Sequence, residues 1–382
     1  MKSILVLFHC ASNTGYAIAT LEKVFFEMAR ALVGGDEARI HFGYPSMARG
    51  PSPAMPDDFR QYLVLDTRSK DPDHRRQVHD YLRRHEIDTI FGFDQPVSMP
   101  MYRHLRRAGI ERFVSYWGAP MSSVFGPIKR SLKRLEVALR RHGPDHYIFE
   151  SYGMAETAIR GRGIPRRKVS VVHLGVDTEV FRPDPADADY PFRELGICRS
   201  RKIFFFSGHM EPRKGVRTIM RAARILAERR RQADWHMLLL GNAPGEERRL
   251  LAELGGNKKA REHVTFGGYR HDLARIHRGC YAGIIASTGW DSLTMSSIEM
   301  QSSGLPLLLS NLPGLNEAIE DGVSGLLFPP GDALALANTI ERLLDDPALR
   351  ERLAQGARQR VESRFTKEIQ HHRLVELMRR LT

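Results

Sequence analysis

Short apolar runs of strand length alternate with longer amphipathic stretches along the whole chain. The apolar runs fall at residues 4–8, 89–93, 113–116, 146–149, 169–172, 203–206, 236–240, 264–266, 283–286, 306–309 and 325–328. Between them lie helical periodicities, of which the spacing of Leu21, Phe25, Met28 and Leu32 is one example. This β-α rhythm in both halves predicts an α/β protein with two doubly wound domains, each built on a parallel sheet.

The length of 382 residues exceeds what one ordinary core supports and favours two domains of similar size. The predicted boundary lies in residues 181–191, a stretch rich in Pro and Asp that has little to bury. We therefore expect an amino-terminal domain over residues 1–182 and a carboxyl-terminal domain over residues 183–365. Residues 366–382 are expected to form a helix that packs back on the first domain, and a ligand cleft is expected at the carboxyl ends of both sheets.

The charge and the cysteine content of the chain indicate which kinds of partner and site to expect. The net charge of +13 implies an anionic partner, such as nucleic acid, phospholipid or a phosphorylated substrate. The three cysteines Cys10, Cys198 and Cys280 are unpatterned, so the sequence predicts neither a disulfide framework nor a metal site, and a cytoplasmic location is the default. The apolar run at residues 4–8 is too short for a signal peptide, and no run is long enough to span a membrane.

A basic pair follows the predicted strand at residues 203–206. Gly208 allows a close approach of the backbone to a ligand, and Arg213 and Lys214 precede a helix that begins after Gly215. Arg offers a planar fork and Lys a point charge, and together they can neutralise a diphosphate. A solvated basic pair on a turn is the alternative.

Two carboxylates, Asp291 and Glu299, stand eight positions apart around a segment rich in Ser and Thr. Carboxylates accept hydrogen bonds from sugar hydroxyls, and the free N–H groups at a helix start hold anionic oxygens. A structural interpretation competes with this one. Ser296 and Glu299 have the spacing of a capping box, and either Asp291 or Ser292 could be an ordinary N-cap.

Residues 203–332 resemble the donor-binding domain of retaining GT-B glycosyltransferases of the large family-four group. The resemblance rests on the basic pair, the paired carboxylates with Asp291 in place of the usual first Glu, and the Gly304-Leu305-Pro306 continuation. Residues 171–183 resemble the segment that precedes the interdomain linker in that family. The resemblance implies a GT-B fold, in which two Rossmann-like domains face each other across a cleft.

The resemblance also implies roles for individual residues. Arg213 and Lys214 would bind the diphosphate of a nucleotide-sugar, Asp291 would hold sugar hydroxyls, and Glu299 would accept the ribose hydroxyls. The catalytic residues implied are Asp291, Arg213 and Lys214. The donor-binding residues implied are these three together with Gly15, Gly208, Tyr269, Ser292, Leu293, Thr294, Met295 and Glu299.

In the amino-terminal half, Gly15 stands where the family often has a Gly-Gly turn near the donor phosphates; a plain strand-to-helix turn is the alternative. Many relatives carry a His near the reacting sugar, but residues 114–120 contain none. Tyr116 and Trp117 are therefore expected to shape the acceptor pocket, unless they are buried aromatics at a strand end.

Residues 127–141 predict a basic amphipathic helix. Its apolar stripe of Ile128, Leu132, Leu135 and Leu139 is flanked by Lys and Arg. Such a helix can rest on an anionic membrane that carries a lipid-linked acceptor. The favoured interpretation is nevertheless an ordinary helix that packs its stripe inward.

The sequence thus predicts retaining transfer of a hexose-type sugar from a nucleoside-diphosphate sugar to a glycan, glycolipid or small-molecule hydroxyl. The expected setting is bacterial surface polysaccharide or glycoconjugate assembly, in the cytoplasm or on the inner face of the membrane. No cofactor, no metal and no nucleic-acid partner are expected. The alternatives are a nucleotide-sugar epimerase, a non-catalytic binder of nucleotide-sugars and, from charge alone, a nucleic-acid binder.

Overall fold

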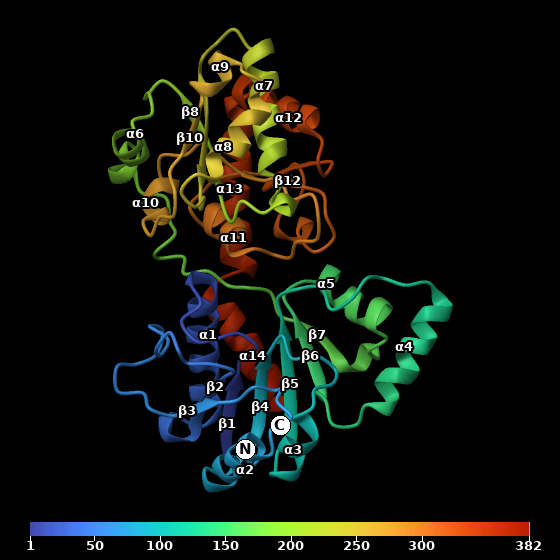
Figure 1. Ribbon diagram of the computed structural model, residues 1–382. Helices are drawn as coiled ribbons and strands as arrows, with labels where there is room; N and C mark the ends of the chain where they lie inside the picture. Colours follow the sequence, from blue (N-terminus) through green and yellow to red (C-terminus); the bar gives the residue numbers. More distant parts are fainter. Residues whose placement is uncertain (382) are drawn as a thin grey trace. The chain divides into compact units, whose positions relative to one another are not determined.

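The computed structural model describes residues 1–381, which fold into two compact units (Figure 1). The first unit comprises residues 1–173 together with the chain from residue 368 onward, and the second comprises residues 174–367. Each unit is an α/β layer structure around one parallel sheet.

The sheet of the first unit has seven parallel strands in the order β3-β2-β1-β4-β5-β6-β7. The strands are β1 (Ser3–Leu7), β2 (Ile40–Tyr44), β3 (Tyr62–Val64), β4 (Ile87–Phe93), β5 (Arg112–Trp117), β6 (His146–Phe149) and β7 (Val169–Val171). The chain starts in the middle at β1, extends to one edge, and then crosses over to β4 on the other side. This is the doubly wound topology that the β-α rhythm predicts.

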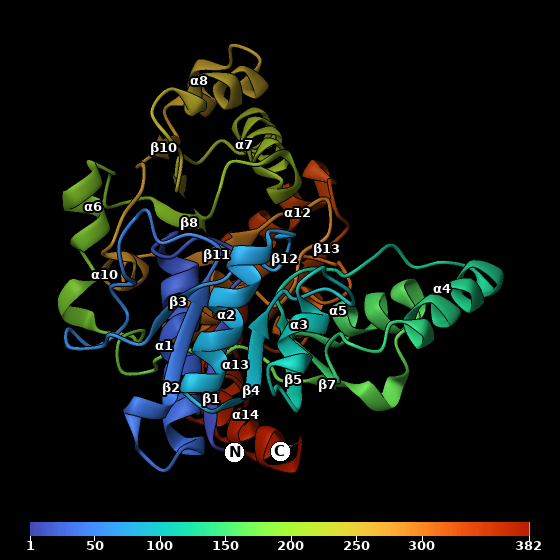
Figure 2. The same ribbon diagram turned by 60° about the horizontal axis from the view of Figure 1, so that its bottom comes forward.

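Helices cover both faces of this sheet, as Figure 2 shows for α1 and α2. The helices of the first unit are α1 (Tyr16–Leu32), α2 (Pro72–Arg84), α3 (Tyr102–Arg107), α4 (Pro127–Leu139), α5 (Tyr152–Glu156) and α14 (Lys367–Leu381). Alternate side chains along each strand point to opposite faces of the sheet, and each face packs against helices in its own hydrophobic core. Leu5 and Ile90 pack with Val78 and Leu82 of α2 on one face, while Phe25 of α1 contacts aromatic rings of β4 and β5.

The sheet of the second unit has six parallel strands in the order β10-β9-β8-β11-β12-β13. The strands are β8 (Lys202–Ser207), β9 (Trp235–Leu240), β10 (Val264–Phe266), β11 (Ala282–Ile285), β12 (Leu307–Ser310) and β13 (Gly325–Phe328). Here the order reverses between β8 and β11, because the chain passes from β8 to β9 and β10 before it returns to the other side of β8.

The helices of the second unit are α6 (Tyr190–Leu195), α7 (Val216–Arg229), α8 (Glu246–Leu251), α9 (Lys258–Arg261), α10 (Leu273–His277), α11 (Met295–Ser302), α12 (Ala333–Asp345) and α13 (Pro347–Arg364). Ile219 and Leu226 of α7 pack with Leu343 of α12 and with Met237 in the hydrophobic core of this unit. Side-chain oxygens cap several of these helices; Asp332, for example, accepts from Ala335 N at 2.9 Å at the start of α12.

The boundary between the units differs from the one predicted. The chain divides at residue 173 rather than at residue 182. Val176 already donates its backbone N–H to Phe365 O at 2.8 Å, and Arg358 donates to Phe181 O at 3.0 Å. One carboxylate of the predicted linker, Asp187, also pairs with Arg275 and Arg278 of this unit. These contacts attach residues 174–191 to the second unit.

Candidate functional site

The predicted basic pair and the first carboxylate meet in the second unit, at the carboxyl ends of β8 and β11. These neighbouring strands flank the point where the strand order of the sheet reverses. In open α/β sheets the loops diverge at this point, and ligands bind in the crevice that they leave. The topology therefore singles out one place in this unit for a ligand.

Gly215 determines the path of the segment that carries Arg213 and Lys214. Its backbone φ is +72°, and a Cβ atom at this position would lie 1.7 Å from Ala286 O. Only glycine fits, since both the conformation and the space exclude a side chain. Thr288 N also donates to Arg213 O at 2.7 Å. The basic pair is thus held directly against the loop that follows β11.

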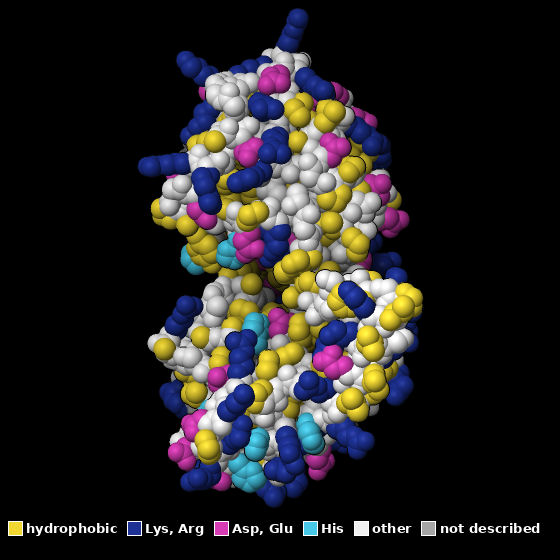
Figure 3. All heavy atoms as spheres, turned by 45° about the vertical axis from the view of Figure 1, so that its right-hand side comes forward, with side chains coloured by type: hydrophobic (Ala, Val, Ile, Leu, Met, Phe, Trp, Pro, Cys, Tyr) yellow, Lys and Arg dark blue, Asp and Glu magenta, His cyan; other side chains and the backbone are white. Residues whose placement is uncertain are grey.

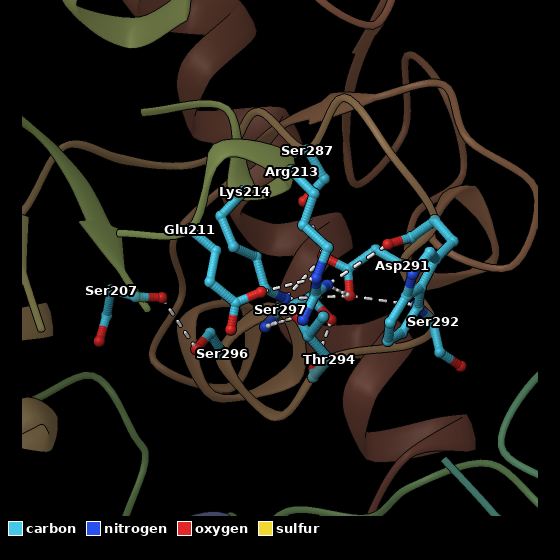
Figure 4. Close-up of polar contacts among 11 residues, drawn as sticks. Ser207, Glu211, Arg213, Lys214, Ser287, Asp291, Ser292, Thr294, Ser296 and Ser297 are labelled. Atoms are coloured by element: carbon cyan, nitrogen blue, oxygen red, sulfur yellow. Dashed lines mark hydrogen bonds and ion pairs between the residues drawn. The ribbon is translucent and has the colours of Figure 1, made fainter. Parts of the chain in front are cut away.

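Asp291 is the centre of the polar cluster (Figure 4). Lys214 Nζ lies 2.8 Å from Asp291 Oδ2 and 3.0 Å from Oδ1. Ser287 Oγ donates to Oδ2 at 2.7 Å, and Ser292 N donates to Oδ1 at 3.2 Å. The Asp291 side chain is only 5% exposed, so these donors replace the water that a buried carboxylate loses.

Arg213 lies beside this pair. Its Nη1 is 3.8 Å from Asp291 Oδ1, and its Nε is 2.8 Å from Glu211 Oε2. The guanidinium also stacks over the Trp290 ring, 4.1 Å from the ring centroid. Sequence reasoning missed Glu211 and Trp290, although both lie within two positions of a predicted residue.

Helix α11 begins at the same place, and its cap differs from both structural interpretations of the motif. Thr294 is the N-cap, and its Oγ1 accepts from Ser297 N at 3.2 Å. The capping box of Ser296 and Glu299 is therefore wrong, as is an N-cap at Asp291 or Ser292. Ser296 Oγ instead donates to Ser207 O at 3.3 Å, which ties the helix start to the end of β8.

Thr294 and Met295 are half-buried at this helix start, whereas Ser292 and Leu293 are buried. Glu299 lies one turn into α11 and is 2% exposed. Its backbone carbonyl accepts from Ser303 N at 3.0 Å. The two carboxylates of the motif thus occupy different positions, with Asp291 beside the cations and Glu299 buried on α11.

The remaining predicted residues of this unit lie after β8 and β10. Gly208 N donates to Leu240 O at 3.1 Å. A Cβ atom added at Gly241 would lie only 2.4 Å from Gly208 O, so the two glycine backbones approach each other closely. Tyr269 follows β10, is 61% exposed, and contacts the His271 ring edge-on at 5.0 Å. The Tyr269 ring is therefore accessible to a ligand.

In the first unit, Gly15 immediately precedes α1 with a φ of +130°, a conformation that favours glycine. Trp117 is half-buried, and its Nε1 donates to Gln95 O at 3.3 Å. Tyr116 is fully buried against Phe25 and Phe93, and its hydroxyl donates to Val172 O at 3.4 Å. Tyr116 therefore belongs to the core and presents no surface to an acceptor. Of the two interpretations given for this residue, the buried aromatic at a strand end is the one that the structure supports.

A polar pair that sequence reasoning missed lies at the carboxyl edge of the first sheet. Asp94 follows β4 with a φ of +50° and accepts from Gly118 N at 3.1 Å. His9 follows β1, and its Nδ1 is 3.8 Å from Asp94 Oδ2. Burial raises the pKa of Asp94 to about 7 and lowers the pKa of His9. The strand order of this sheet reverses between β1 and β4. Only this topology marks the pair as a candidate site, since the sequence around each residue carries no motif.

Within residues 1–381, no group of three or more His, Cys, Asp or Glu side chains is placed to hold a metal ion. The same residues contain no helix with the length and apolar character needed to cross a membrane. The cluster around Asp291 combines two cations, a carboxylate and a helix start. Such a set can bind an anionic group and hydroxyls side by side.

Two family profiles match successive parts of the chain. Residues 21–180 match Glycosyltransferase Family 4, and residues 191–360 match Glycosyl transferases group 1. The chain belongs to the family-four, group 1 glycosyltransferases. The second match includes Arg213, Lys214 and the whole α11 motif, so the cluster described above lies in the group 1 region.

Individual relatives agree with this family. A D-inositol 3-phosphate glycosyltransferase of Frankia alni is 33% identical over 198 residues, which are 50% of this chain and 48% of that protein. The chain thus spans about half the length of the curated relatives it matches.

Solved structures show the same fold. A glycosyltransferase from Rickettsia africae superposes with a TM-score of 0.79 at 14% identity, over 100% of this chain and 98% of the other. Anabaena HepE in complex with UDP gives a TM-score of 0.75 at 19% identity, over 98% of this chain and 99% of the other. The predicted GT-B fold class is confirmed by these likenesses.

Proposed function

We propose that this protein is a retaining glycosyltransferase that moves a hexose-type sugar from a nucleoside-diphosphate sugar to a hydroxyl group. The observation that carries the proposal is the Lys214–Asp291 pair, with distances of 2.8 and 3.0 Å, beside Arg213 and the start of α11. A nucleotide-sugar has an anionic diphosphate next to a ring of hydroxyls, and this cluster offers a partner for each part.

The diphosphate would bind to the cations and the helix start. Lys214 contributes a point charge and Arg213 a planar fork, and the first N–H groups of α11 have no partner within their own helix. Charge grows on the diphosphate as the glycosidic bond breaks. Donors fixed in place before the reaction stabilise that charge with little reorganisation, so Arg213 and Lys214 are proposed as catalytic residues.

The two carboxylates would divide the rest of the donor between them. Asp291 is proposed to accept hydrogen bonds from the sugar hydroxyls, while Lys214 turns from Asp291 toward the phosphates. Glu299 is proposed to accept the ribose hydroxyls, and Tyr269 to border the nucleobase. Backbone groups of Gly15, Gly208 and residues 292–295 would approach the phosphates and the sugar.

Retention of the anomeric configuration is proposed to follow a front-side course. Asp291 is already bonded to Lys214 and Ser287, and Glu299 is buried in its helix, so neither is assigned as a nucleophile. The leaving phosphate would instead take the proton of the attacking hydroxyl. In this scheme Arg213 and Lys214 would neutralise the phosphates, and no metal takes part.

The acceptor is proposed to be a glycan or a lipid-linked saccharide in bacterial surface polysaccharide or glycoconjugate assembly, a common setting for family-four enzymes. Such an acceptor would place the protein in the cytoplasm, at the inner face of the membrane. Trp117 and the His9–Asp94 edge of the first sheet are candidates for contacts with the acceptor.

A thermal-shift screen across nucleoside diphosphates and their sugars tests the donor site. A true donor at about 100 times its dissociation constant should stabilise the folded protein by roughly 2.7 kcal/mol. The best donor is then incubated with and without hydroxyl acceptors. Transfer that requires an acceptor supports the proposal. Conversion of the donor alone would indicate an epimerase, and no shift with any nucleotide would overturn the donor site.

A further inference from the structure

Helix α4 carries an apolar face that nothing in the described chain covers. Ile128, Leu132, Leu135 and Leu139 are 79%, 64%, 59% and 72% exposed, respectively. The favoured prediction, that this stripe packs inward, is therefore wrong. The four side chains recur at helical spacing and form one continuous stripe about 16 Å long. Soluble proteins seldom expose such a stripe unless it binds a partner.

The opposite face of α4 is the one that holds it to the protein. Gly163, with a φ of +84°, brings the chain so close that a Cβ atom would lie 2.6 Å from Arg134 N. Val137 packs against the core of the first unit. Glu136 binds both Nη atoms of Arg162, at 2.9 and 3.0 Å. The helix is thus fixed in an orientation that turns its leucines outward.

The polar surroundings of the stripe are almost entirely cationic. Glu136 is the only acid in residues 127–141, and hydrogen bonds from Arg162 and Lys133 lower its pKa to about 2. The Glu136 carboxylate is thus paired with two cations of the protein itself. Figure 3 shows hydrophobic side chains beside Lys and Arg along this edge of the first unit.

A groove of about 650 Å³ adjoins the carboxyl-terminal half of α4. Its charged lining has one acid, Asp145, which is paired with Arg106 at 2.8 Å. Its cationic lining residues are Arg134, Arg140, Arg141, Arg166, Arg167 and Lys168. The groove therefore has the size and charge to receive phosphate groups beside the carboxyl-terminal half of α4.

We propose that α4 lies in the interface of an anionic phospholipid bilayer, with its apolar stripe among the acyl chains and the flanking cations on the lipid phosphates. An apolar stripe bounded by Lys and Arg is the pattern of interfacial helices. A second copy of this chain is a poorer partner, because pairing two such faces would bring their cations together. The inference extends the proposed function, since it would bring the enzyme to the surface that displays a lipid-linked acceptor.

Co-sedimentation with vesicles tests this directly. The full chain should bind vesicles of phosphatidylglycerol and phosphatidylcholine more tightly than vesicles of phosphatidylcholine alone, and added salt should weaken that binding. The double variant Leu132→Gln/Leu135→Gln should lose at least about tenfold in partitioning. Gln keeps the helix propensity of Leu, and both positions are exposed, so the melting temperature should not change.

The matched control is Val323→Gln/Leu334→Gln, which changes two exposed apolar residues of the second unit and should bind vesicles like wild type. Equal binding by wild type and the α4 variant would overturn the inference. So would a wild-type dimer in sedimentation velocity that the α4 variant dissociates. Donor binding by thermal shift is read on the same samples, so failure of membrane binding and failure of the donor site are distinguished.

A single-site probe adds a readout of depth. After the emission of wild type with its three native tryptophans is subtracted, Leu135→Trp should show a blue-shifted emission and quenching by brominated acyl chains when anionic vesicles are added. Emission that stays unshifted while the protein co-sediments would mean that charge alone holds the protein, and would overturn insertion of the stripe.

Discussion

Lys214 and Asp291, 77 positions apart in sequence, form a two-pronged ion pair with distances of 2.8 and 3.0 Å. Their side chains are 17% and 5% exposed, so the pair is largely shielded from water. The lysine follows β8 and the aspartate follows β11, which makes the pair a bond across the switch point of the second sheet. The cation assigned to the donor and the carboxylate assigned to the sugar are thus coupled before any ligand binds.

This coupling predicts a stability effect. Lys214→Met should destabilise the protein by about 3 kcal/mol, because it leaves the buried Asp291 carboxylate without its main partner. Lys214→Met combined with Asp291→Leu should be less destabilised than the single variant, since no charge remains buried. Urea unfolding of the four proteins in a double-mutant cycle measures the difference. Strict additivity of the two changes would show that the pair contributes nothing.

Glu299 should act on the nucleotide alone. Glu299→Gln removes the charge while keeping the shape, and it should weaken binding of the bare nucleoside diphosphate by about tenfold, as expected for loss of a charged hydrogen bond. Asp291→Asn should mainly weaken the sugar-bearing form. Calorimetric titration of each ligand separates the two effects. Glu351→Gln, on an exposed side chain of α13, is the control and should bind both ligands normally.

Much of the fold could be predicted because apolar runs and their spacing are local properties. Each of the eleven predicted runs overlaps a strand of one of the two sheets, with ends that differ by at most one residue from the strand where a run extends beyond it. Two strands were missed. In β2, His41 and Gly43 interrupt the apolar run, and β3 has only three residues at a sheet edge. Both take their strand conformation from pairing with a neighbour, which no local pattern reports.

The site was predictable in part for the same reason. Residue types identified Arg213, Lys214 and Asp291, but their direct contact depends on which strands are neighbours. Periodicity likewise marks the stripe of α4 without telling what it faces. Tyr116 shows the same limit of prediction from sequence. An aromatic at a strand end can point into a pocket or into the core, and only the structure shows that Tyr116 points into the core.

Gly215 supports a third prediction. Gly215→Ala should destabilise the protein by roughly 3 kcal/mol or more, because the new Cβ meets Ala286 O as well as a left-handed backbone. Gly34→Ala is the matched control. Its φ is +70°, but no atom lies within 4 Å of the added Cβ, so its loss should be about 1 kcal/mol. Equal losses in thermal or urea unfolding would show that the close approach to Ala286 is unimportant.

Asp94 should make stability depend on pH in an unusual direction. Burial raises the pKa of its carboxyl to about 7 from an ordinary 3.8, so between these values the folded state keeps a proton that the unfolded state has released. The contribution of Asp94 is therefore fully present below pH 4 and is lost as the pH rises through 7. Relative to Asp94→Asn, wild type should lose roughly 3 kcal/mol of unfolding free energy over that range.

Asn is the suitable replacement because it tolerates the left-handed backbone at position 94 and can still accept from Gly118 N. The neighbouring His9, whose pKa is lowered by burial, contributes stability that instead rises with pH. His9 is present in both proteins, so its own contribution largely cancels in the difference. Urea unfolding of wild type and Asp94→Asn at pH 4.5, 6 and 8 measures that difference. A constant gap across the three pH values would mean that the Asp94 carboxyl ionises in the folded protein as readily as in water, and that the polar edge between β1 and β4 is hydrated rather than buried.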